Sequence, residues 1–334
     1  MNASVGGVEV TTEYSGLGER AKVLRHIAVV THCVPELDQV VAAWTQYLGY
    51  RVVEHGTLGA ELCATWDTPA AAGQRYCTLL PESGQDTYIR FVETADTGGY
   101  GPPMTFGWNA TELLVRDVDA LSVRFRGSPF SVLGGPGDLY SRPRAPRAMQ
   151  VVGPSGELLY FTRILPGGSR YGLHGAHSAV DRVFIVTVGG PSSDAMHAFY
   201  GGTLGQRIMD RMPFINTILA DGCGVERSTI FPTSIARIPG RSFLVEMDEY
   251  PASVQPRRRR PGHLPPGMSM VSFLVRSLDA LPVPLRATAR RIDGLPYGGR
   301  RVAVIEGHAG EWLELIEGER ASYSLDFSRT ARNQ

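Results

Sequence analysis

The stretch HIAVVTHCVPELDQVVAAWTQYLGYRVV (residues 26–53) decides the fold. It begins with the β-branched run Ile27–Val30, which is typical of a strand. Apolar side chains then recur at helical spacing from Leu37 to Leu48, and Gly49 stands where the end of a helix needs a positive φ. The stretch therefore predicts a strand, a helix that ends at Gly49, and a second strand.

The same order of elements returns in RVFIVTVGGPSSDAMHAFYGGTLGQRIMD (residues 182–210), where Ser192 or Ser193 can cap the helix and Gly205 can end it. Two shorter copies are NATELLVRDVDALSVRF (residues 109–125) and SMVSFLVRSLDALPVPLRA (residues 269–287). Each short copy pairs an apolar strand with an aspartate at the start of a short predicted helix. Such self-similarity indicates a fold built by duplication of one unit.

Each copy then closes with an apolar strand, at residues 88–92, 158–162, 243–247 and 312–316. The turn sequences GPSG (153–156) and GHAG (307–310) precede the second and fourth of these strands. Glycine at both ends of such a turn favours a tight hairpin between two strands. The chain is therefore predicted to contain four copies of a β-α-β-β-β module.

Three segments resemble modules of the vicinal oxygen chelate superfamily, which includes glyoxalases, bleomycin resistance proteins and extradiol dioxygenases. YLGY (47–50) and FYGGTLG (199–205) resemble the helix ends of such modules, and LEL (313–315) resembles their last strand. The resemblance covers about residues 23–320. It implies an α+β fold in which four βαβββ modules pair into two open, U-shaped, mixed-sheet barrels, each around a cleft.

Pairing in chain order would divide the chain into five parts. These are an N-terminal arm (1–22), a first pair of modules (23–165), a linker (166–180), a second pair (181–320) and a C-terminal tail (321–334). In a branch that resembles hydroquinone-cleaving dioxygenases, the first module pairs with the last instead. The sequence leaves both pairings open.

The resemblance also implies where a cleft metal would bind, because the usual ligands are two histidines and a glutamate on the first and last strands of paired modules. Imidazole and carboxylate ligands suit Fe(II), Mn or Zn. The corresponding positions are His26, Ala110, Arg182 and Met270 on first strands, and Arg90, Tyr160, Glu246 and Glu314 on last strands. Only His26 and Glu314 match the pattern, with Glu246 as a third candidate.

This partial set favours chemistry without a metal. Arg182 is a permanent cation and cannot donate a lone pair to a metal, so we expect it to balance Glu246 or Glu314 and to stabilise negative charge on a substrate. The candidate catalytic residues are Glu314, Glu246, Arg182, His26 and Tyr160, the last as an acid or base at the cleft edge. No cofactor is expected; the alternative is a divalent metal (Fe, Mn or Zn) held by His26 and Glu314.

The same residues also have structural interpretations. His26 can be a strand-end histidine bonded to the backbone, and either glutamate can form an ion pair with Arg182 in place of a lost metal. Tyr160 can be a core aromatic residue. The sequence leaves these alternatives open.

Composition argues against some classes of binding partner. The 33 basic and 33 acidic residues of the 334-residue chain cancel, so no net charge draws it to nucleic acid or membrane. The four cysteines have no CxxC spacing and are expected to be buried thiols in a reducing, cytoplasmic protein. We expect a small-molecule substrate as the partner, and a homodimer stays open.

Three functions follow from this pattern. The first is an enzyme that acts on a small oxygenated, aromatic or polycyclic substrate by metal-independent, lyase- or isomerase-like acid/base chemistry. The cleft would be lined by Trp66, Trp108, Phe106 and Tyr160. The second is a metal-dependent, extradiol-dioxygenase-like or lyase enzyme that uses His26 and Glu314. The third is a resistance-type protein that binds a small molecule without chemistry.

Overall fold

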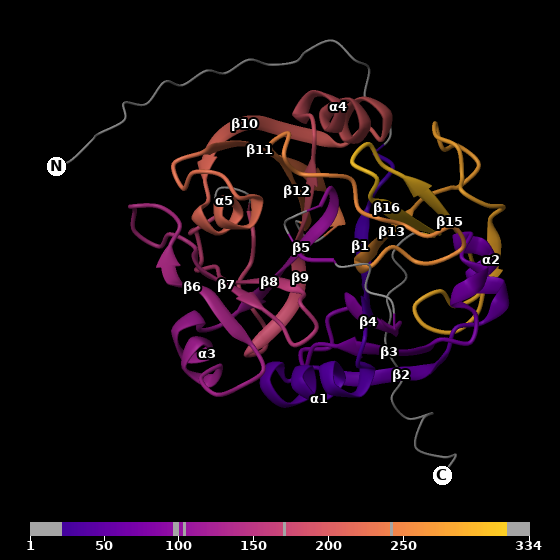
Figure 1. Ribbon diagram of the computed structural model, residues 1–334, viewed down its shortest axis with the longest axis horizontal. Helices are drawn as coiled ribbons and strands as arrows, with labels where there is room; N and C mark the ends of the chain where they lie inside the picture. The colour runs from indigo at the N-terminus through magenta and orange to yellow at the C-terminus, as the bar shows by residue number, and fades with distance from the viewer. Residues whose placement is uncertain (1–21, 96–99, 103–104, 170–171, 241–242, 319–334) are drawn as a thin grey trace.

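The computed structural model describes residues 22–95, 100–102, 105–169, 172–240 and 243–318. The predicted arm at 1–22 and tail at 321–334 lie outside this part of the chain, apart from Lys22. Within it, sixteen strands form two strongly curled, mixed sheets of eight strands each. Figure 1 shows the two sheets side by side, each curling around its own concave face. The predicted α+β class is confirmed.

The first sheet combines the first and fourth modules in the order β14-β15-β16-β13-β1-β4-β3-β2. Its strands are β1 (His26–Val34), β2 (Arg51–Thr57), β3 (Arg75–Leu80), β4 (Tyr88–Glu93), β13 (Gly267–Val275), β14 (Arg290–Ile292), β15 (Arg300–Glu306) and β16 (Trp312–Glu317). At its centre β1 and β13 run antiparallel, and each is parallel to the last strand of its own module.

The second sheet combines the third and second modules in the order β10-β11-β12-β9-β5-β8-β7-β6. Its strands are β5 (Gly107–Val115), β6 (Ser131–Asp138), β7 (Arg147–Val152), β8 (Leu158–Arg163), β9 (Val180–Gly190), β10 (Arg207–Ile215), β11 (Ile230–Ile238) and β12 (Phe243–Glu249). Here β5 and β9 form the antiparallel centre.

The pairing of first with last module is therefore the observed one, and pairing in chain order is wrong. Residues 23–165 contribute half of each sheet, and residues 166–180 join two strands of one sheet rather than two barrels. The central strands β1, β5, β9 and β13 are buried along their whole length. Because all four are buried on both faces, their sequence pattern does not indicate which two will pair.

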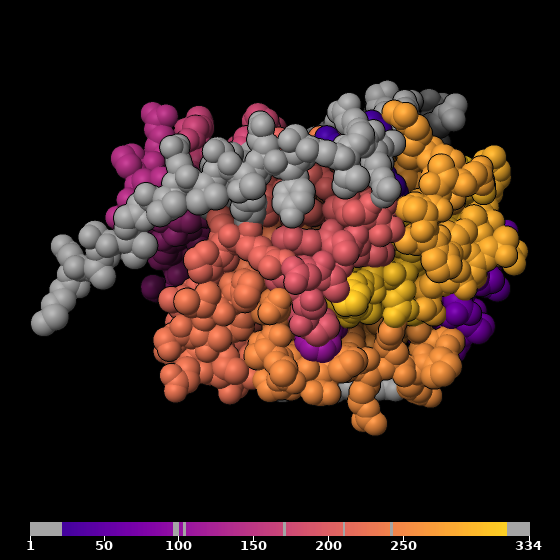
Figure 2. Space-filling model, turned by 90° about the horizontal axis from the view of Figure 1, so that it is seen from above, coloured from indigo at the N-terminus to yellow at the C-terminus, as the bar shows by residue number. Residues whose placement is uncertain are grey.

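Modules that follow each other in the chain meet through their convex sides instead. The indole Nε1 of Trp44 donates to Oε1 of Glu157 at 3.0 Å, just after the second module's hairpin turn. In the other half, the Tyr200 hydroxyl donates to Oε1 of Glu311 at 2.9 Å, just after the fourth module's turn. Figure 2 shows the salmon atoms of the third module against the yellow atoms of the fourth. One apolar core runs between the two sheets.

The helices follow the predicted pattern in three modules. Helix α1 (Leu37–Leu48) ends at Gly49, whose φ is 69°. Helix α3 (Val118–Arg124) is capped by the side chain of Asp117, and α4 (Ser193–His197) by that of Ser192 before it continues as the π-helical turn η2 (Ala198–Thr203). Short helices α2 (Ala60–Trp66) and α5 (Thr217–Cys223) lie in loops that the module pattern did not place.

The fourth module departs from the pattern, because the predicted helix after residue 277 is absent and turns take its place. Pro282 and Pro284 explain this difference. Each lacks the amide hydrogen that a helix interior needs, and each disfavours helical backbone in the residue before it.

Two further expectations concern the described part of the chain. The four cysteines are buried and unpaired there. Among the described helices, none is both long enough and apolar enough to span a bilayer.

Candidate functional site

The last-strand residues occupy equivalent positions in the two sheets. In the first sheet Arg90 lies beside Thr31, and Glu314 lies beside Ser272. In the second sheet Glu246 lies beside Thr187, and Tyr160 lies beside Glu112. The four last-strand positions predicted from the sequence are therefore confirmed as a set, although they fall in two separate clefts.

The first-strand residues chosen from the sequence occupy equivalent positions in the second and fourth modules. Those chosen in the first and third modules lie too early in the strand. Ala110 lies seven residues before its helix cap (110 to 117), whereas His26 and Arg182 lie ten residues before theirs (26 to 36 and 182 to 192). Counting seven residues back from the caps gives Val29 and Ile185 instead. The strand register gives the same two positions. Val29 pairs with Ser272 in the first sheet, and Ile185 pairs with Glu112 at the equivalent place in the second.

His26 lies at the start of β1 and is 3% exposed. Its Nε2 is 3.3 Å from the carbonyl oxygen of Asp86, and its ring meets the edge of the Phe243 ring at 4.6 Å. These contacts match the structural interpretation of a strand-end histidine bonded to the backbone.

Arg182 does not form the expected ion pair with Glu246 or Glu314. Its guanidinium lies over the Phe243 ring at 4.6 Å and donates to the carbonyl oxygen of Val183 at 3.1 Å. The reason is register: Glu246 pairs with Thr187, which lies five residues further along β9.

Glu314 faces the concave side of the first sheet, as predicted, but the space around it is filled. It accepts hydrogen bonds from Trp66 Nε1 at 2.6 Å, from the Tyr297 hydroxyl at 2.7 Å and from the Ser272 hydroxyl. Leu313 and Leu315, which point the other way, lie in the core between the sheets. Glu314 is completely buried, so this carboxylate holds the cleft wall together.

Arg90, and not Arg182, supplies the positive charge near Glu314. Its guanidinium lies 5.5 Å from the Trp66 ring and 5.3 Å from the Tyr297 ring. Burial lowers the pKa of Arg90, but Tyr297 and Glu314 outweigh that effect and keep it raised. A polar cavity of about 220 Å³ lies beside Arg90 and Tyr297, yet Glu314 does not line it.

The residues do not fit the alternative metal site. The described contacts of His26 are with Asp86 and Phe243, and those of Glu314 are with three hydrogen-bond donors. A carboxylate whose oxygens already accept three hydrogen bonds has little capacity left for a metal. Among the described residues, no group of three or more His, Cys, Asp or Glu side chains could hold a metal ion.

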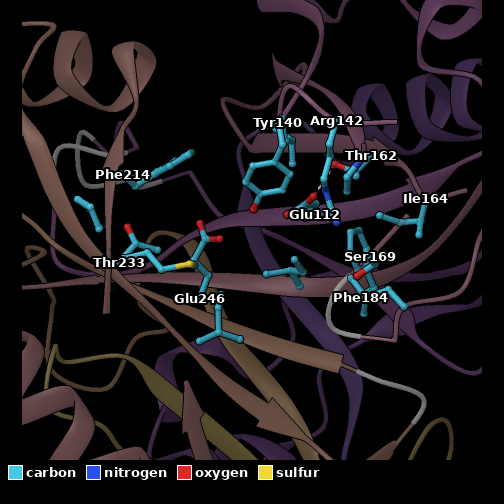
Figure 3. A pocket seen from close by; sticks show the side chains of 17 residues that line it. Glu112, Tyr140, Arg142, Thr162, Ile164, Ser169, Phe184, Phe214, Thr233 and Glu246 are labelled. Carbon is cyan, nitrogen blue, oxygen red and sulfur yellow. Dashed lines mark hydrogen bonds between the residues drawn. The ribbon is translucent and has the colours of Figure 1, made fainter. Parts of the chain in front are cut away.

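The second sheet holds an open cavity of about 240 Å³ on its concave face. Figure 3 shows Glu112 and Glu246 in its wall, with Tyr140 and Arg142 above them and Phe184 and Phe214 to the sides. Its remaining wall is mainly apolar. It is formed by Leu139, Pro146, Ile164, Leu173, Ile185, Met212, Pro213 and Ile235, with the hydroxyl residues Thr162, Ser169 and Thr233. A mostly apolar cavity with a few convergent polar groups is typical of a small-molecule site.

Glu112 and Glu246 line this cavity, Asp248 lies on the same strand as Glu246, and all three carboxyl groups have raised pKa values. Burial raises the pKa of Glu112 to about 7, against the effect of a hydrogen bond from Thr162. Burial, followed by the charges of Asp248 and Glu112, raises the pKa of Glu246 well above its ordinary value. Burial also raises the pKa of Asp248 to about 6, although Thr233 donates a hydrogen bond to it at 2.6 Å.

Tyr160 belongs to the same cluster. It lies beside Glu112 in register and is partly buried. Burial raises the pKa of its phenol, and the charges of Glu246 and Asp248 raise it further. Tyr160 is therefore protonated at neutral pH and can act only as a hydrogen-bond donor or acceptor, or as a weak acid.

The sequence missed two members of the cluster that strand periodicity could have found. Asp248 follows Glu246 by two residues on β12, and Glu112 follows Ala110 by two residues on β5. Residues two apart on a strand share a face. The aromatic residues that line the cavity also differ from those predicted. Trp66 packs inside the first sheet, and Trp108 donates to the Trp312 carbonyl oxygen, so neither lines the cavity.

The fold is that of known enzymes, although the sequence is remote from them. No family model and no curated protein matches this sequence. Glyoxalase I from Zea mays is similar in structure, with a TM-score of 0.56 and 11% identity over 87% of this chain and 92% of that chain. A "putative dioxygenase" from Bacillus subtilis subsp. subtilis str. 168 gives a TM-score of 0.59 and 12% identity over 90% of this chain and 87% of that chain. The chain has the four-module fold of the vicinal oxygen chelate superfamily.

Proposed function

We propose that this protein is an enzyme that performs acid/base chemistry on a small oxygenated substrate in the cavity of the second sheet. The observation that carries the proposal is Glu246, which lines the cavity, accepts no hydrogen bond from any described residue and has a strongly raised pKa. A carboxyl group kept in its acid form at neutral pH can donate a proton to a substrate oxygen.

Glu112 supplies the complementary base. Its pKa of about 7 means that the acid and carboxylate forms are both populated near neutral pH. A pair of titratable groups with different pKa values lets one donate a proton while the other accepts one. The proposed step is enolisation: Glu246 protonates a carbonyl oxygen, and Glu112 removes a proton from the neighbouring carbon. This chemistry is isomerase- or lyase-like and uses side chains of this chain alone.

The apolar wall supports an aromatic substrate. Tyr140, Phe184 and Phe214 can contact a flat ring, and burial of such a ring contributes most of the binding free energy at sites of this kind. Arg182, Glu314 and His26 do not belong to this proposed machinery, because their described contacts lie elsewhere.

The test is hydrogen–deuterium exchange into enolisable aryl ketones in D2O, followed by NMR with a chelator present. We expect exchange by the unaltered protein and a reduction of about 100-fold or more in Glu246→Gln, the range typical for loss of an acid or base. Glu226→Gln is the control, since it removes an exposed carboxylate outside the cavity.

Two outcomes would contradict the proposal. If chelation abolishes activity and Fe(II) restores it, the metal-dependent alternative is correct. If the ketones bind in the cavity without any exchange, the protein is a small-molecule binder of the resistance type.

A further inference from the structure

We propose that the natural ligand of the second-sheet cavity carries a protonated amine beside its aromatic body, and that Glu246 and Glu112 hold the ammonium group. The inference rests on the site of the proposed function and adds the chemical class of its ligand. It does not depend on whether catalysis follows binding.

The cavity contains unbalanced acidic groups. Glu112 and Glu246 line it, and Asp248 lies on the same face of β12 as Glu246. Arg142 is the one basic residue among the described lining residues, and it is already engaged at the mouth. Its Nη2 donates to the carbonyl oxygen of Gly168 at 2.8 Å, and its guanidinium lies 5.4 Å from the Tyr140 ring.

A second observation points to a missing hydrogen-bonding partner. Thr187 is 2% exposed, and its hydroxyl has no hydrogen-bond partner among the described residues. It lies directly beside Glu246 in the register of β9 and β12, so both side chains are on the concave face. Buried polar groups in folded proteins are almost always paired. An ammonium group brings three donors and no acceptor, which complements carboxylates and a hydroxyl.

An organic cation fits this cavity better than a metal ion. No described group of three carboxylate, imidazole or thiol side chains comes together to hold a metal. Tyr140, Phe184 and Phe214 instead offer ring faces and apolar surface to a ligand body. A cavity of about 150 Å³ is enough for benzene, so one of about 240 Å³ leaves room for an aminoalkyl chain.

Binding of such a cation would be linked to proton release. Burial raises the pKa of Glu112 to about 7 and that of Glu246 well above its ordinary value, so in the empty cavity both groups hold their protons to a higher pH than they would in water. A positive charge placed beside them favours the ionised carboxylates and lowers those pKa values. A neutral ligand of the same shape would leave the protons in place.

The experiment compares 2-phenylethylamine with 2-phenylethanol by isothermal titration calorimetry at pH 7, in phosphate and in Tris. These buffers differ in ionisation enthalpy, so the difference in observed heat counts the protons released. We expect the amine to bind at least about tenfold more tightly than the alcohol and to release about one proton per molecule bound. The alcohol should release none.

Variants assign the effect to the cavity. Glu246→Gln should weaken amine binding by about tenfold to a hundredfold and change alcohol binding less than twofold. Glu226→Gln removes an exposed carboxylate and should change neither. Equal affinities for amine and alcohol, or amine binding that survives Glu246→Gln, would overturn the inference. Amine binding without ketone exchange would leave it standing and would reject the proposed enzymatic step alone.

Discussion

At the scale of single residues, differences at duplicated positions separate the two clefts. Arg90 and Glu246 occupy the same register position in their sheets. Arg90 places a cation near Glu314, so the first cleft holds opposite charges in a hydrogen-bonded interior. Glu246 is instead removed from water and lies near the carboxyl groups of Asp248 and Glu112, so burial first and their charges second disfavour its ionisation. The same fold thus places a buried cation and carboxylate in one cleft and a cluster of carboxyl groups in the other.

The raised pKa of Glu112 leads to a prediction about stability. The carboxyl group of the unfolded chain loses its proton near its ordinary pKa of 4.5, whereas the folded protein holds that proton up to about pH 7. The unfolded state therefore binds fewer protons in this window, and the free energy of unfolding falls as pH rises through it. Glu112→Gln should leave stability nearly unchanged at pH 4 and increase it by up to about 3 kcal/mol at pH 8.

Urea unfolding at both pH values measures this difference. The Thr162 hydroxyl can donate to the glutamine oxygen as it does to Glu112, so the hydrogen bond survives the change. Glu226→Gln, at an exposed position, should show no such dependence on pH. A stability gain of the same size at pH 4 would contradict the assignment, since it could not come from ionisation.

At the scale of elements, glycine at helix ends and residue spacing set the geometry of each module. The backbone N–H of Gly49 donates to the Trp44 carbonyl oxygen with Gly49 in the left-handed region, which turns the chain from α1 into β2. Spacing from the first strand to the helix cap then decides which strand residue reaches the concave face. That spacing is the same in modules one, two and three, so His26 and Arg182, which lie three residues before the equivalent positions Val29 and Ile185, fall outside the site.

The helix end gives a second prediction, for Gly49→Ala. A Cβ at this position would meet nothing closer than Oε2 of Glu82 at 4.0 Å, so the effect comes from the positive φ and not from a clash. We expect a loss of about 1 kcal/mol in the free energy of unfolding. Gly202→Ala is the control, because Gly202 is an exposed helical glycine outside the left-handed region, with nothing within 4 Å.

Thermal and urea unfolding should show a loss of stability for Gly49→Ala and no loss for Gly202→Ala. Alanine at residue 202 restricts the unfolded chain without strain and should be neutral or slightly stabilising. Equal destabilisation by both substitutions would show that loss of glycine, and not the left-handed backbone at residue 49, is the cause.

At the scale of the whole molecule, the pairing of first with last module determines which fragments contain a complete sheet. Residues 105–255 include all eight strands of the second sheet, from β5 to β12. Residues 23–165 also include two modules, but they supply only four strands to each sheet. A sheet cut through its central strand pair exposes an apolar edge that invites aggregation.

The third prediction is that residues 105–255 unfold cooperatively in urea, whereas residues 23–165 show no cooperative transition. Circular dichroism and size-exclusion chromatography of the two fragments check this, and their similar lengths make them matched controls for each other. Cooperative folding of residues 23–165 as a monomer would contradict the observed pairing. It would support pairing in chain order.

The sequence by itself determined the modules, because strand and helix periodicity, helix ends and hairpin turns are local properties of the chain. It placed Gly49, the two glycine turns and the four last strands correctly, and it put Glu246 and Glu314 on inward faces. The helix of the fourth module was the exception, although Pro282 and Pro284 were a local signal against it. Local sequence patterns therefore predict the structure of one module but not how modules pair.

Only the tertiary structure decided which modules pair and which cleft stays open. Four first strands that are buried on both faces are interchangeable by pattern, so the choice between them depends on packing across the whole molecule. The charge of a cleft is settled by residues far apart in sequence: Arg90 meets Glu314, and Glu112 meets Glu246. Burial and through-space charge shift the pKa values of Arg90, Glu112 and Glu246, and neither effect can be read from neighbours along the chain.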